Sequence, residues 1–362
     1  MAQYSQSWLI SLSLAILMVF ALVDATSARP PLQRRAGLQP SVTGSLYPMS
    51  TGQSTYPRAS FRSDGTILGA YTAIANGETI ITLTSSSDSG ATWSVLGTAA
   101  RGPANTTDID NPYPIELPSG RLLVAYRSHD QTAGVEDAWT YYRLIVSYSD
   151  DGGANWDYLS TPAQEPGPTT GVWEPFMRMA DDGETLQLYY SRETTDIDQD
   201  SLIKTSTDGG KTWSEARTFT GLNLTKNRDG MLGVAKTNDE GGLIAVFETE
   251  TDGSNFHIGA VSSSDDGLTW TDRRIVHETE SNNSAPQVTN VGGTLVVSFQ
   301  TNEDGDYAVK VVTSKDGKNW GDKTTVMTAT SKWAGLLTLD DSSFLVMAGH
   351  NGVASAQKVI LA

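Results

Sequence analysis

The chain has 362 residues, a formal net charge of −17 at pH 7 and no cysteine. So acidic a surface repels nucleic acid and other polyanions, and a chain without cysteine forms no disulfides. We therefore exclude nucleic acid as a partner and expect a neutral substrate, or simply a well-solvated surface.

The N-terminus carries targeting and processing signals. An apolar run followed by small residues predicts a signal peptide over residues 1–28. Residues 29–35 end in two arginines, which predicts a short propeptide, and without residues 1–35 the formal charge becomes −19. Three sequons, at Asn105, Asn223 and Asn282, agree with secretion. No other stretch is apolar enough to span a bilayer, so we expect an extracellular protein that does not associate with membranes.

Residues 36–362 are predicted to form a single domain, in which the pattern Ser-x-Asp-x-Gly-x-x-Trp recurs. Four full copies and one shortened copy begin at Ser86, Ser149, Ser206, Ser263 and Ser314. The Asp accepts bonds from nearby backbone N–H groups, the Gly supplies a positive φ and the Trp packs against neighbouring strands. We predict that each copy staples a β-hairpin and has no catalytic role. Each offers too few carboxylates for a calcium site.

A second repeat gives the number of structural units. Polar turns precede an apolar, alternating strand six times, at Gly65, Gly120, Gly183, Gly242, Gly293 and Ser343. Such alternation is typical of antiparallel strands, and no segment has a sustained helical stripe. Four-stranded units repeated radially make a β-propeller, so the sequence predicts an all-β, six-bladed propeller. Because the last unit ends at its third strand, we expect the segment 45–50 to close the ring.

The propeller geometry predicts where a site lies. The start of the first strand and the end of the second open on the same face in every blade, so residues there converge on a central funnel. The candidates for substrate binding at those places are Arg58, Asp110, Asn111, Arg127, Trp173, Arg228, Asp229, Gln287 and Trp333. The tryptophans either stack on a sugar face or belong to the core.

Two glutamates, Glu174 and Glu248, follow apolar strand residues beside the axis. Partial burial would raise the pKa of one carboxyl and leave the other ionised, which is the division of labour that glycoside hydrolysis requires. In the alternative, each carboxylate only pairs with a nearby arginine such as Arg228. No set of His and carboxylate residues has metal-ligand spacing, so we expect no metal and no cofactor.

The repeated octapeptide resembles the Asp box of sialidases and related propellers. The segments YPRAS, DIDNPYPIELPSGRLLVAYR, GVWEPF, NRDGM and VFE make the chain similar to glycoside hydrolase family 93, the fungal exo-arabinanases. The resemblance implies release of arabinobiose from plant cell-wall α-1,5-L-arabinan, with Glu174 and Glu248 catalytic. It also implies retention of configuration, with the carboxyls about 5–5.5 Å apart. Which glutamate is the nucleophile stays open, and we favour Glu174.

One departure from the family concerns the last blade. The family has an active-site tyrosine there, whereas the last tyrosine of this chain is Tyr307 and the last blade offers Trp333, Leu336 and Leu337. Either another residue compensates, or activity is reduced, altered or absent. The missing tyrosine also argues against a sialidase, which needs a tyrosine nucleophile and an arginine cluster.

Three alternatives for the function follow: an exo-arabinanase, a sialidase-type exoglycosidase, and a non-catalytic sugar-binding propeller. We expect a monomer, since the blade edges are covered.

Overall fold

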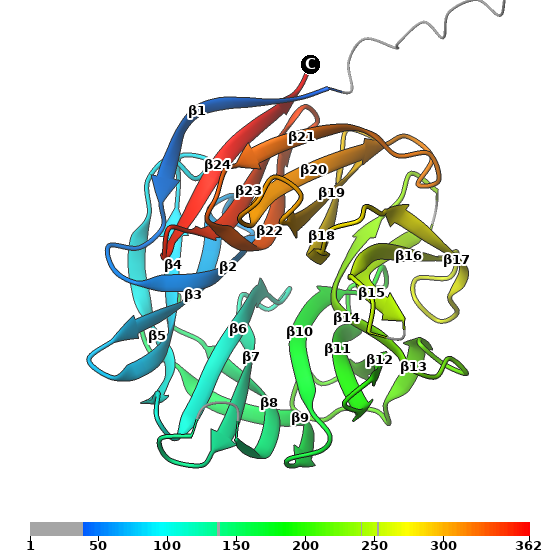
Figure 1. The fold of residues 1–362 in the computed structure, drawn as a ribbon. Coiled ribbons are helices and arrows are strands. Elements are labelled where there is room, and N and C mark those ends of the chain that lie inside the picture. Colours follow the sequence, from blue (N-terminus) through cyan, green and yellow to red (C-terminus); the bar gives the residue numbers. More distant parts are fainter. Residues whose placement is uncertain (1–38, 136–137, 240, 252) are drawn as a thin grey trace, which may run out of the picture. The chain divides into compact units, whose positions relative to one another are not determined.

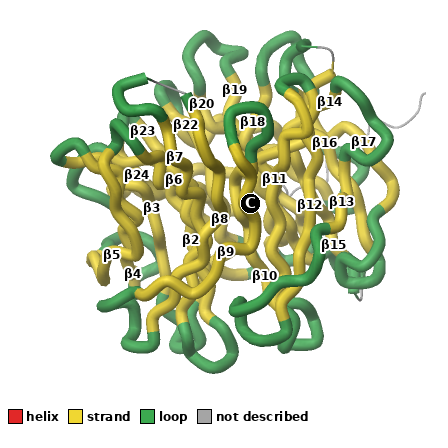
Figure 2. The backbone as a smooth tube through the Cα atoms, turned by 90° about the horizontal axis from the view of Figure 1, so that it is seen from below, coloured by secondary structure: helices red, strands yellow, loops and turns green. Residues whose placement is uncertain are grey.

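The computed structural model describes residues 39–362 apart from residues 136–137, 240 and 252. The predicted signal peptide and propeptide lie outside these residues. In the described part, every regular element is a β-strand, as Figure 2 shows by its strands and connecting loops. No helix in this part is long and apolar enough to span a membrane.

Four sheets have four antiparallel strands each (Figure 1). The first contains β2 (Ser54–Phe61), β3 (Ile67–Ala75), β4 (Glu78–Ser86) and β5 (Ser94–Pro103). The second contains β6 (Thr107–Glu116), β7 (Leu122–Gln131), β8 (Trp139–Ser149) and β9 (Asp157–Pro166). The third contains β18 (Asn283–Val291), β19 (Thr294–Thr301), β20 (Ala308–Ser314) and β21 (Gly321–Met327). The fourth contains β22 (Ser331–Asp340), β23 (Ser343–His350), β24 (Val353–Leu361) and the N-terminal β1 (Pro40–Pro48).

The N-terminal strand closes the ring, as predicted. Strand β1 lies antiparallel to β24, with Val42 opposite Val359, so the first and last strands of the described chain share one sheet. The closing strand begins at Pro40, earlier than the predicted segment 45–50, because the pairing continues to Leu361.

The fifth sheet has eight strands. It joins two antiparallel groups: β10 (Val172–Met179), β11 (Leu186–Thr195), β12 (Asp198–Ser206) and β13 (Arg217–Thr220), then β14 (Asn227–Lys236), β15 (Leu243–Thr251), β16 (His257–Ser263) and β17 (Thr271–His277). The all-β propeller is thus confirmed, but the predicted division into six separate sheets is not. The reason is the short β13, which pairs with β12 only at residues 201–203 and leaves Gln199 free to form a parallel bridge with Arg228 of β14.

The innermost strands contact one another in a closed ring, in the order β2, β6, β10, β14, β18 and β22. Each of them carries a register shift, a β-bulge, near its start. At each bulge one non-glycine residue has a positive φ between 47° and 62°: Tyr56, Asn111, Glu174, Met231, Ala285 and Trp333. A β-bulge redirects a side chain at some cost in backbone strain, so this repeated distortion gathers six side chains of the funnel.

The Asp boxes form the predicted hairpin staples. In one copy, Asp151 accepts the backbone N–H of Asn155 (3.0 Å) and the hydroxyl of Ser149 (2.8 Å), while Trp156 donates its indole N–H to the carbonyl of Gly153 (2.8 Å). Gly153 has a φ of 100°, which an L side chain rarely adopts. The same bond from the backbone to the aspartate recurs at Asp88, Asp208, Asp265 and Asp316.

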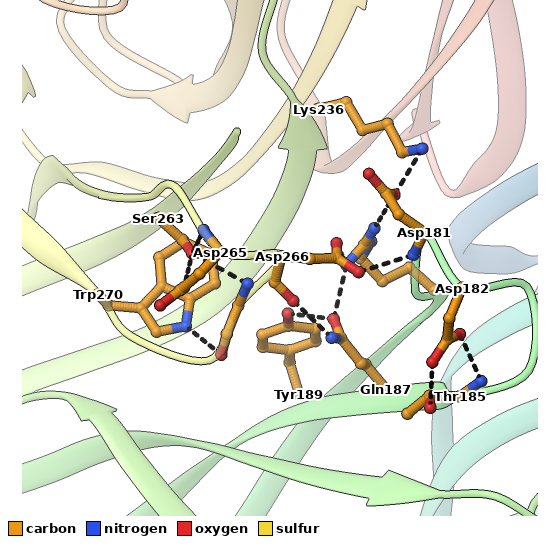
Figure 3. A network of polar contacts seen from close by, with 12 residues as sticks. Asp181, Asp182, Thr185, Gln187, Tyr189, Lys236, Ser263, Asp265, Asp266 and Trp270 are labelled. Atoms are coloured by element: carbon orange, nitrogen blue, oxygen red, sulfur yellow. Dashed lines mark hydrogen bonds and ion pairs between the residues drawn. The ribbon is translucent and has the colours of Figure 1, made fainter. Parts of the chain in front are cut away.

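The fourth Asp box also fastens the two halves of the eight-stranded sheet together (Figure 3). Asp266 accepts the backbone N–H of Asp181 (2.6 Å), and its carbonyl accepts the side-chain amide of Gln187 (2.8 Å). Tyr189 donates to Gln187 (2.6 Å), and Lys236 pairs with Asp181 (2.6 Å). This network follows the β10–β11 turn and therefore lies at the opposite end of the strands from the funnel.

Candidate active site

Glu174 is the bulge residue of β10, with a φ of 47° and a half-buried side chain. Burial raises its pKa to about 8, and the charge of Glu248 acts in the same direction. The charge of Arg127 favours the ionised form and acts in the opposite direction. Glu174 is therefore a carboxyl that keeps its proton far above the usual range.

Glu248 reaches the same place from β15, where it pairs with Gly230 of β14. Burial raises its pKa to about 7. The backbone N–H of Ala285, the bulge residue of β18, donates to its Oε2 (2.8 Å), and this bond and the charge of Arg228 limit the rise. The bulge of one innermost strand thus positions a carboxyl that belongs to the neighbouring group of strands.

The structure brings the two predicted glutamates close enough for the charge of Glu248 to raise the pKa of Glu174. Two interacting carboxyls do not lose their protons independently, so ionisation of Glu248 makes the loss of the second proton, from Glu174, harder. One carboxylic acid beside one carboxylate is the arrangement that glycoside hydrolysis requires.

Arg127 belongs to β7 of the second sheet, and its charge acts on Glu174. Its Nε is 2.7 Å from Asp108 Oδ2, and its Nη2 is 3.3 Å from Asp110 Oδ2. The guanidinium carbon is 5.3 Å from the centre of the Trp173 ring and 5.8 Å from that of Tyr56. Burial alone would lower the pKa of Arg127, but the two aspartates raise it, so the group stays charged. It supplies fixed positive charge beside Glu174.

Asp110 is buried at the side of this arginine. Burial raises its pKa to about 6, although Arg127 favours the ionised form. Its Oδ1 accepts the Thr72 hydroxyl (2.5 Å) and the backbone N–H of Asn111 (2.8 Å). Asn111 is itself the buried bulge residue of β6, so both predicted residues lie in the funnel wall.

Arg228 is paired with a carboxylate other than the two predicted ones. Its Nη2 lies 2.8 Å from Glu193 Oε1 and 3.0 Å from Gln199 Oε1, and its Nη1 donates to the carbonyl of Asp196 (2.8 Å). The alternative in which Glu174 and Glu248 serve only as partners of Arg228 is therefore not what the structure shows.

Asp229, a predicted substrate-binding residue, is wholly buried and forms a two-bond ion pair with Arg273 of β17 (2.6 and 2.8 Å). Asn227 adds a third bond to the same carboxylate (2.7 Å). The geometry is that of a structural pair that holds β14 to β17, and the structure does not bring this carboxylate to the glutamate pair.

Arg58 and Gln287 lie two residues beyond their bulges and are also buried. Arg58 donates to the carbonyls of Pro57 and Trp333 (both 2.9 Å), and burial lowers its pKa to about 10. The Arg58 side chain has room because the neighbouring innermost strand, β22, has a glycine at position 335. A Cβ added to Gly335 would lie 3.3 Å from Cδ of Arg58. Both side chains line one small cavity together with the bulge residues Asn111, Glu174 and Met231.

Two predicted tryptophans form different parts of the funnel. Trp173 is half-buried among His129, Trp139 and Tyr142, with ring centres 4.8 to 6.1 Å away, and it lines a cavity of about 630 Å³ next to Glu193. Trp333 stacks on Tyr56, with ring centres 4.5 Å apart and planes inclined by 18°. Both rings pack against protein on one side and are partly exposed on the other.

Sequence reasoning missed three residues of this site: Tyr56, Asp108 and Glu193. Tyr56 starts the segment in which only Arg58 was selected, and Asp108 starts the segment that contains Asp110. Glu193 follows the end of the apolar part of β11 and raises the pKa of Glu174. The rule that selected strand ends could have found all three, because each lies at such an end.

The closed ring of sheets, the Asp-box staples and the carboxyl pair at the axis define an Asp-box β-propeller with a candidate glycosidase-type site. The profile of the BNR repeat-like domain matches residues 59–238 and 163–357, and the chain belongs to this family. A comparison with curated proteins finds no match.

Among solved structures, the chain is similar to a family 93 α-L-arabinofuranosidase of Fusarium graminearum in complex with arabinobiose. The identity is 24%, the TM-score is 0.69, and 89% of this chain and 98% of that one are covered. An α-L-arabinanase of Penicillium chrysogenum complexed with arabinobiose has 20% identity, a TM-score of 0.68 and coverage of 90% and 98%. An intramolecular trans-sialidase of Ruminococcus gnavus has 13% identity, a TM-score of 0.61 and coverage of 85% and 95%. The likeness concerns the fold.

Proposed function

We propose that this protein is an exo-acting glycoside hydrolase of family 93 that releases arabinobiose from α-1,5-L-arabinan with retention of configuration. The observation that carries the proposal is that Glu174, at the bulge of β10, and Glu248, held by the backbone N–H of Ala285, come together in surroundings that raise the pKa of both carboxyls. One carboxyl would act as nucleophile and the other as acid and then base. The likeness to structures that contain arabinobiose supports the choice of sugar.

The proposed architecture is a six-bladed propeller. Each half of the eight-stranded sheet is an antiparallel group of four strands. We therefore count each half as one blade, and the two blades are joined by the single bridge between Gln199 and Arg228. The six innermost strands, each with its own bulge residue, support this count.

The arginines favour a neutral glycan over a sialoside. A sialidase needs free guanidinium groups for the substrate carboxylate, whereas Arg58 is bound to two backbone carbonyls and Arg127 to two aspartates. The negative charge of the whole chain would also repel an anionic substrate. We further propose that the protein acts outside the cell as a monomer, after loss of residues 1–35.

The first experiment is chromatography of the products from linear α-1,5-arabinan. We expect arabinobiose as the only early product, and we expect Glu174→Gln and Glu248→Gln each to lower kcat by several orders of magnitude without loss of folding. Asp181→Asn, in the network at the other end of the strands, serves as the control with unchanged kcat. Release of sialic acid from a sialoside, or sugar binding without turnover, would contradict the proposal and favour the other two alternatives.

The assignment of nucleophile and acid/base uses the alanine variants with azide and an aryl arabinoside. Azide attacks the sugar directly when the nucleophile is missing, which gives an inverted glycosyl azide. It attacks the covalent intermediate when the acid/base is missing, which gives a retained one. The anomeric configuration of the product, read by NMR, therefore assigns each glutamate.

A further inference from the structure

His129 is a wholly buried histidine of β7 that the proposed reaction does not use. Its Nε2 lies 2.9 Å from the carbonyl oxygen of Val172, the first residue of β10. Because a carbonyl oxygen only accepts hydrogen bonds, Nε2 carries the hydrogen and donates it. This bond joins the second sheet to the strand that carries Glu174, two residues before the glutamate.

The carbonyl of Val172 has no partner in its own sheet. Glu193 of β11 donates its backbone N–H to the carbonyl of Gly171 (2.9 Å), and Val172 lies opposite Arg192. Bonded residues alternate in an antiparallel ladder, so the carbonyl of Val172 points away from β11. The order of strands in this sheet ends at β10, and Val172 is only 1% exposed. His129 therefore satisfies a buried acceptor that the ladder leaves unpaired.

Three aromatic rings hold the imidazole of His129 in place. Tyr142 and Trp139 of β8 lie 4.9 and 5.6 Å from its centre, and Trp173 of β10 lies at 4.8 Å. All three planes are inclined to the imidazole by 73° to 81°, so the contacts are edge to face. Packing from three sides fixes the direction in which Nε2 points.

The other ring nitrogen indicates a neutral imidazole. In the part of the chain that the structure describes, Nδ1 of His129 is buried and has no hydrogen-bond partner. A second proton would leave a buried donor unpaired and add a charge away from water. Burial and the positive charges of Arg127 and Arg143 hold the pKa of His129 well below its usual value, although the bond to Val172 opposes them.

The bulge of β10 makes this anchor important. The pairing of β10 with β11 covers Val172 and Trp173, is interrupted, and resumes at Phe176. Glu174 lies in the interruption with a φ of 47°. A strained bulge keeps its shape only when the chain on both sides is held. A displacement of Val172 would therefore reach the glutamate through two peptide units.

We propose that His129 is a positioning residue that, as a neutral imidazole with its hydrogen on Nε2, anchors the carbonyl of Val172 and thereby holds the carboxyl of Glu174 in place. It acts through the backbone and takes no part in proton transfer. Its effect on turnover rests on the proposed function, whereas its tautomer and its hydrogen bond do not.

The first test is ¹H–¹⁵N NMR of the whole protein with ¹⁵N-labelled histidine. The signal of His129 is assigned through its nuclear Overhauser contacts with the three aromatic rings. We expect a hydrogen on Nε2 only, and no change of the ring between about pH 4.5 and 8, where the glutamates titrate. A hydrogen on Nδ1, or a ring that becomes charged in this range, would overturn the proposal even if the protein does not act on arabinan.

The second test compares two amide variants on arabinan. In His129→Gln the side-chain N–H reaches about as far as Nε2 of the histidine, whereas in His129→Asn it reaches only the position of Nδ1. The glutamine variant should keep kcat within about threefold. The asparagine variant should lower kcat by about tenfold, with KM changed less than about threefold, because the Val172 carbonyl loses its donor.

Tyr126→Phe is the matched control for the kinetic test. Tyr126 is a buried residue of the same strand, and its hydroxyl is 3.0 Å from that of Ser147 in the second sheet. Its loss should lower the melting temperature and leave kcat unchanged. Equal losses of kcat in His129→Gln and His129→Asn would overturn the proposal. A higher KM at unchanged kcat would also contradict it, because the histidine would then serve the ring of Trp173 and not Glu174.

Discussion

Glu174 and Glu248 are held in surroundings that oppose their ionisation. Because burial raises both pKa values above those of an unfolded chain, the folded protein binds more protons than the unfolded one between about pH 4.5 and 8. These groups contribute most to stability below pH 4.5, and that contribution is lost as the pH rises through about 7 and 8. Ionisation of these two carboxyls, on which turnover depends, therefore lowers the stability of the folded protein.

We predict that Glu174→Gln stabilises the protein while removing activity. At pH 8 the melting temperature should rise by ~3 °C or more, because the amide has no charge to desolvate, and at pH 4.5 the difference should nearly vanish. Scanning calorimetry at both pH values measures it. Glu184→Gln, at an exposed acid in the β10–β11 turn, is the control and should show no such gain. An equal effect at both pH values would point to packing instead of charge.

For Asp229 we predict that substitution destabilises the protein, in contrast to Glu174→Gln. Asp229→Asn removes the negative charge that Arg273 and Asn227 bind at a wholly buried position, so stability should fall by about 2 kcal/mol. The KM of the protein that remains folded should not change, because the pair lies away from the glutamates. Chemical denaturation measures the first quantity and steady-state kinetics the second. A KM effect without loss of stability would return Asp229 to the substrate-binding residues.

The sequence could predict that Glu174, Glu248 and Arg127 lie together, because strand topology alone brings the ends of neighbouring blades to one face. It could not separate Asp229 from Asp110, two acids at equivalent strand starts. That difference depends on Arg273, a residue 44 positions further along the chain, whose side chain reaches back to β14. Long-range pairing of this kind is invisible to a local pattern.

At the scale of the element, the aspartate of each Asp box accepts several hydrogen bonds from the backbone and side chains of its own loop. The backbone N–H and side chain of Thr212 bond to Asp208 and lower its pKa to about 2. Asp208 therefore stabilises the folded protein above pH 3.8, which is its pKa in the unfolded chain. This stabilisation decreases as the pH falls below 3.8, and by pH 2 most of it is lost.

We therefore predict that Asp208→Asn lowers the melting temperature at pH 7 and that the gap to the unmodified protein narrows between pH 4 and pH 2. Glu215, an exposed acid in the loop that follows the same Asp box, provides the control. Glu215→Gln should leave the melting temperature unchanged at every pH. A gap for Asp208→Asn that stays constant down to pH 2 would be the contrary result.

The bulges were only partly predictable. Four of the six bulge residues precede proline, at Tyr56, Asn111, Glu174 and Ala285, and proline inside a strand indicates a break in the ladder. Met231 and Trp333 have no such signal, yet their φ angles are 47° and 62°. The closure of the ring imposes the same bend on every innermost strand, and no local sequence reports that constraint.

At the scale of the whole molecule, the pairing of β1 with β24 holds the ring closed. Deletion of residues 1–48 would leave the edge of β24 unpaired and expose apolar residues such as Ala356 and Val359, which are buried in the intact sheet. We expect this truncation to melt at least ~10 °C lower and to aggregate.

Deletion of residues 1–38, which ends just before β1, is the matched control and should melt like the full chain. Differential scanning fluorimetry and light scattering compare the two. Equal stability of both truncated forms would show that the other interfaces between sheets hold the ring without β1.

The two ends of the described chain meet in one sheet. The order of the blades along the sequence therefore depends only on where in the ring the chain termini lie. A peptide linker from Ala362 to Gln39, whose backbone atoms are already hydrogen-bonded (3.2 Å), would join them with little strain. New ends could then be opened in an exposed turn such as that at Gly120, on the side away from the funnel. Such a circular permutant should keep the carboxyl pair intact, and it would turn the closing sheet into an ordinary blade built from one continuous stretch of chain.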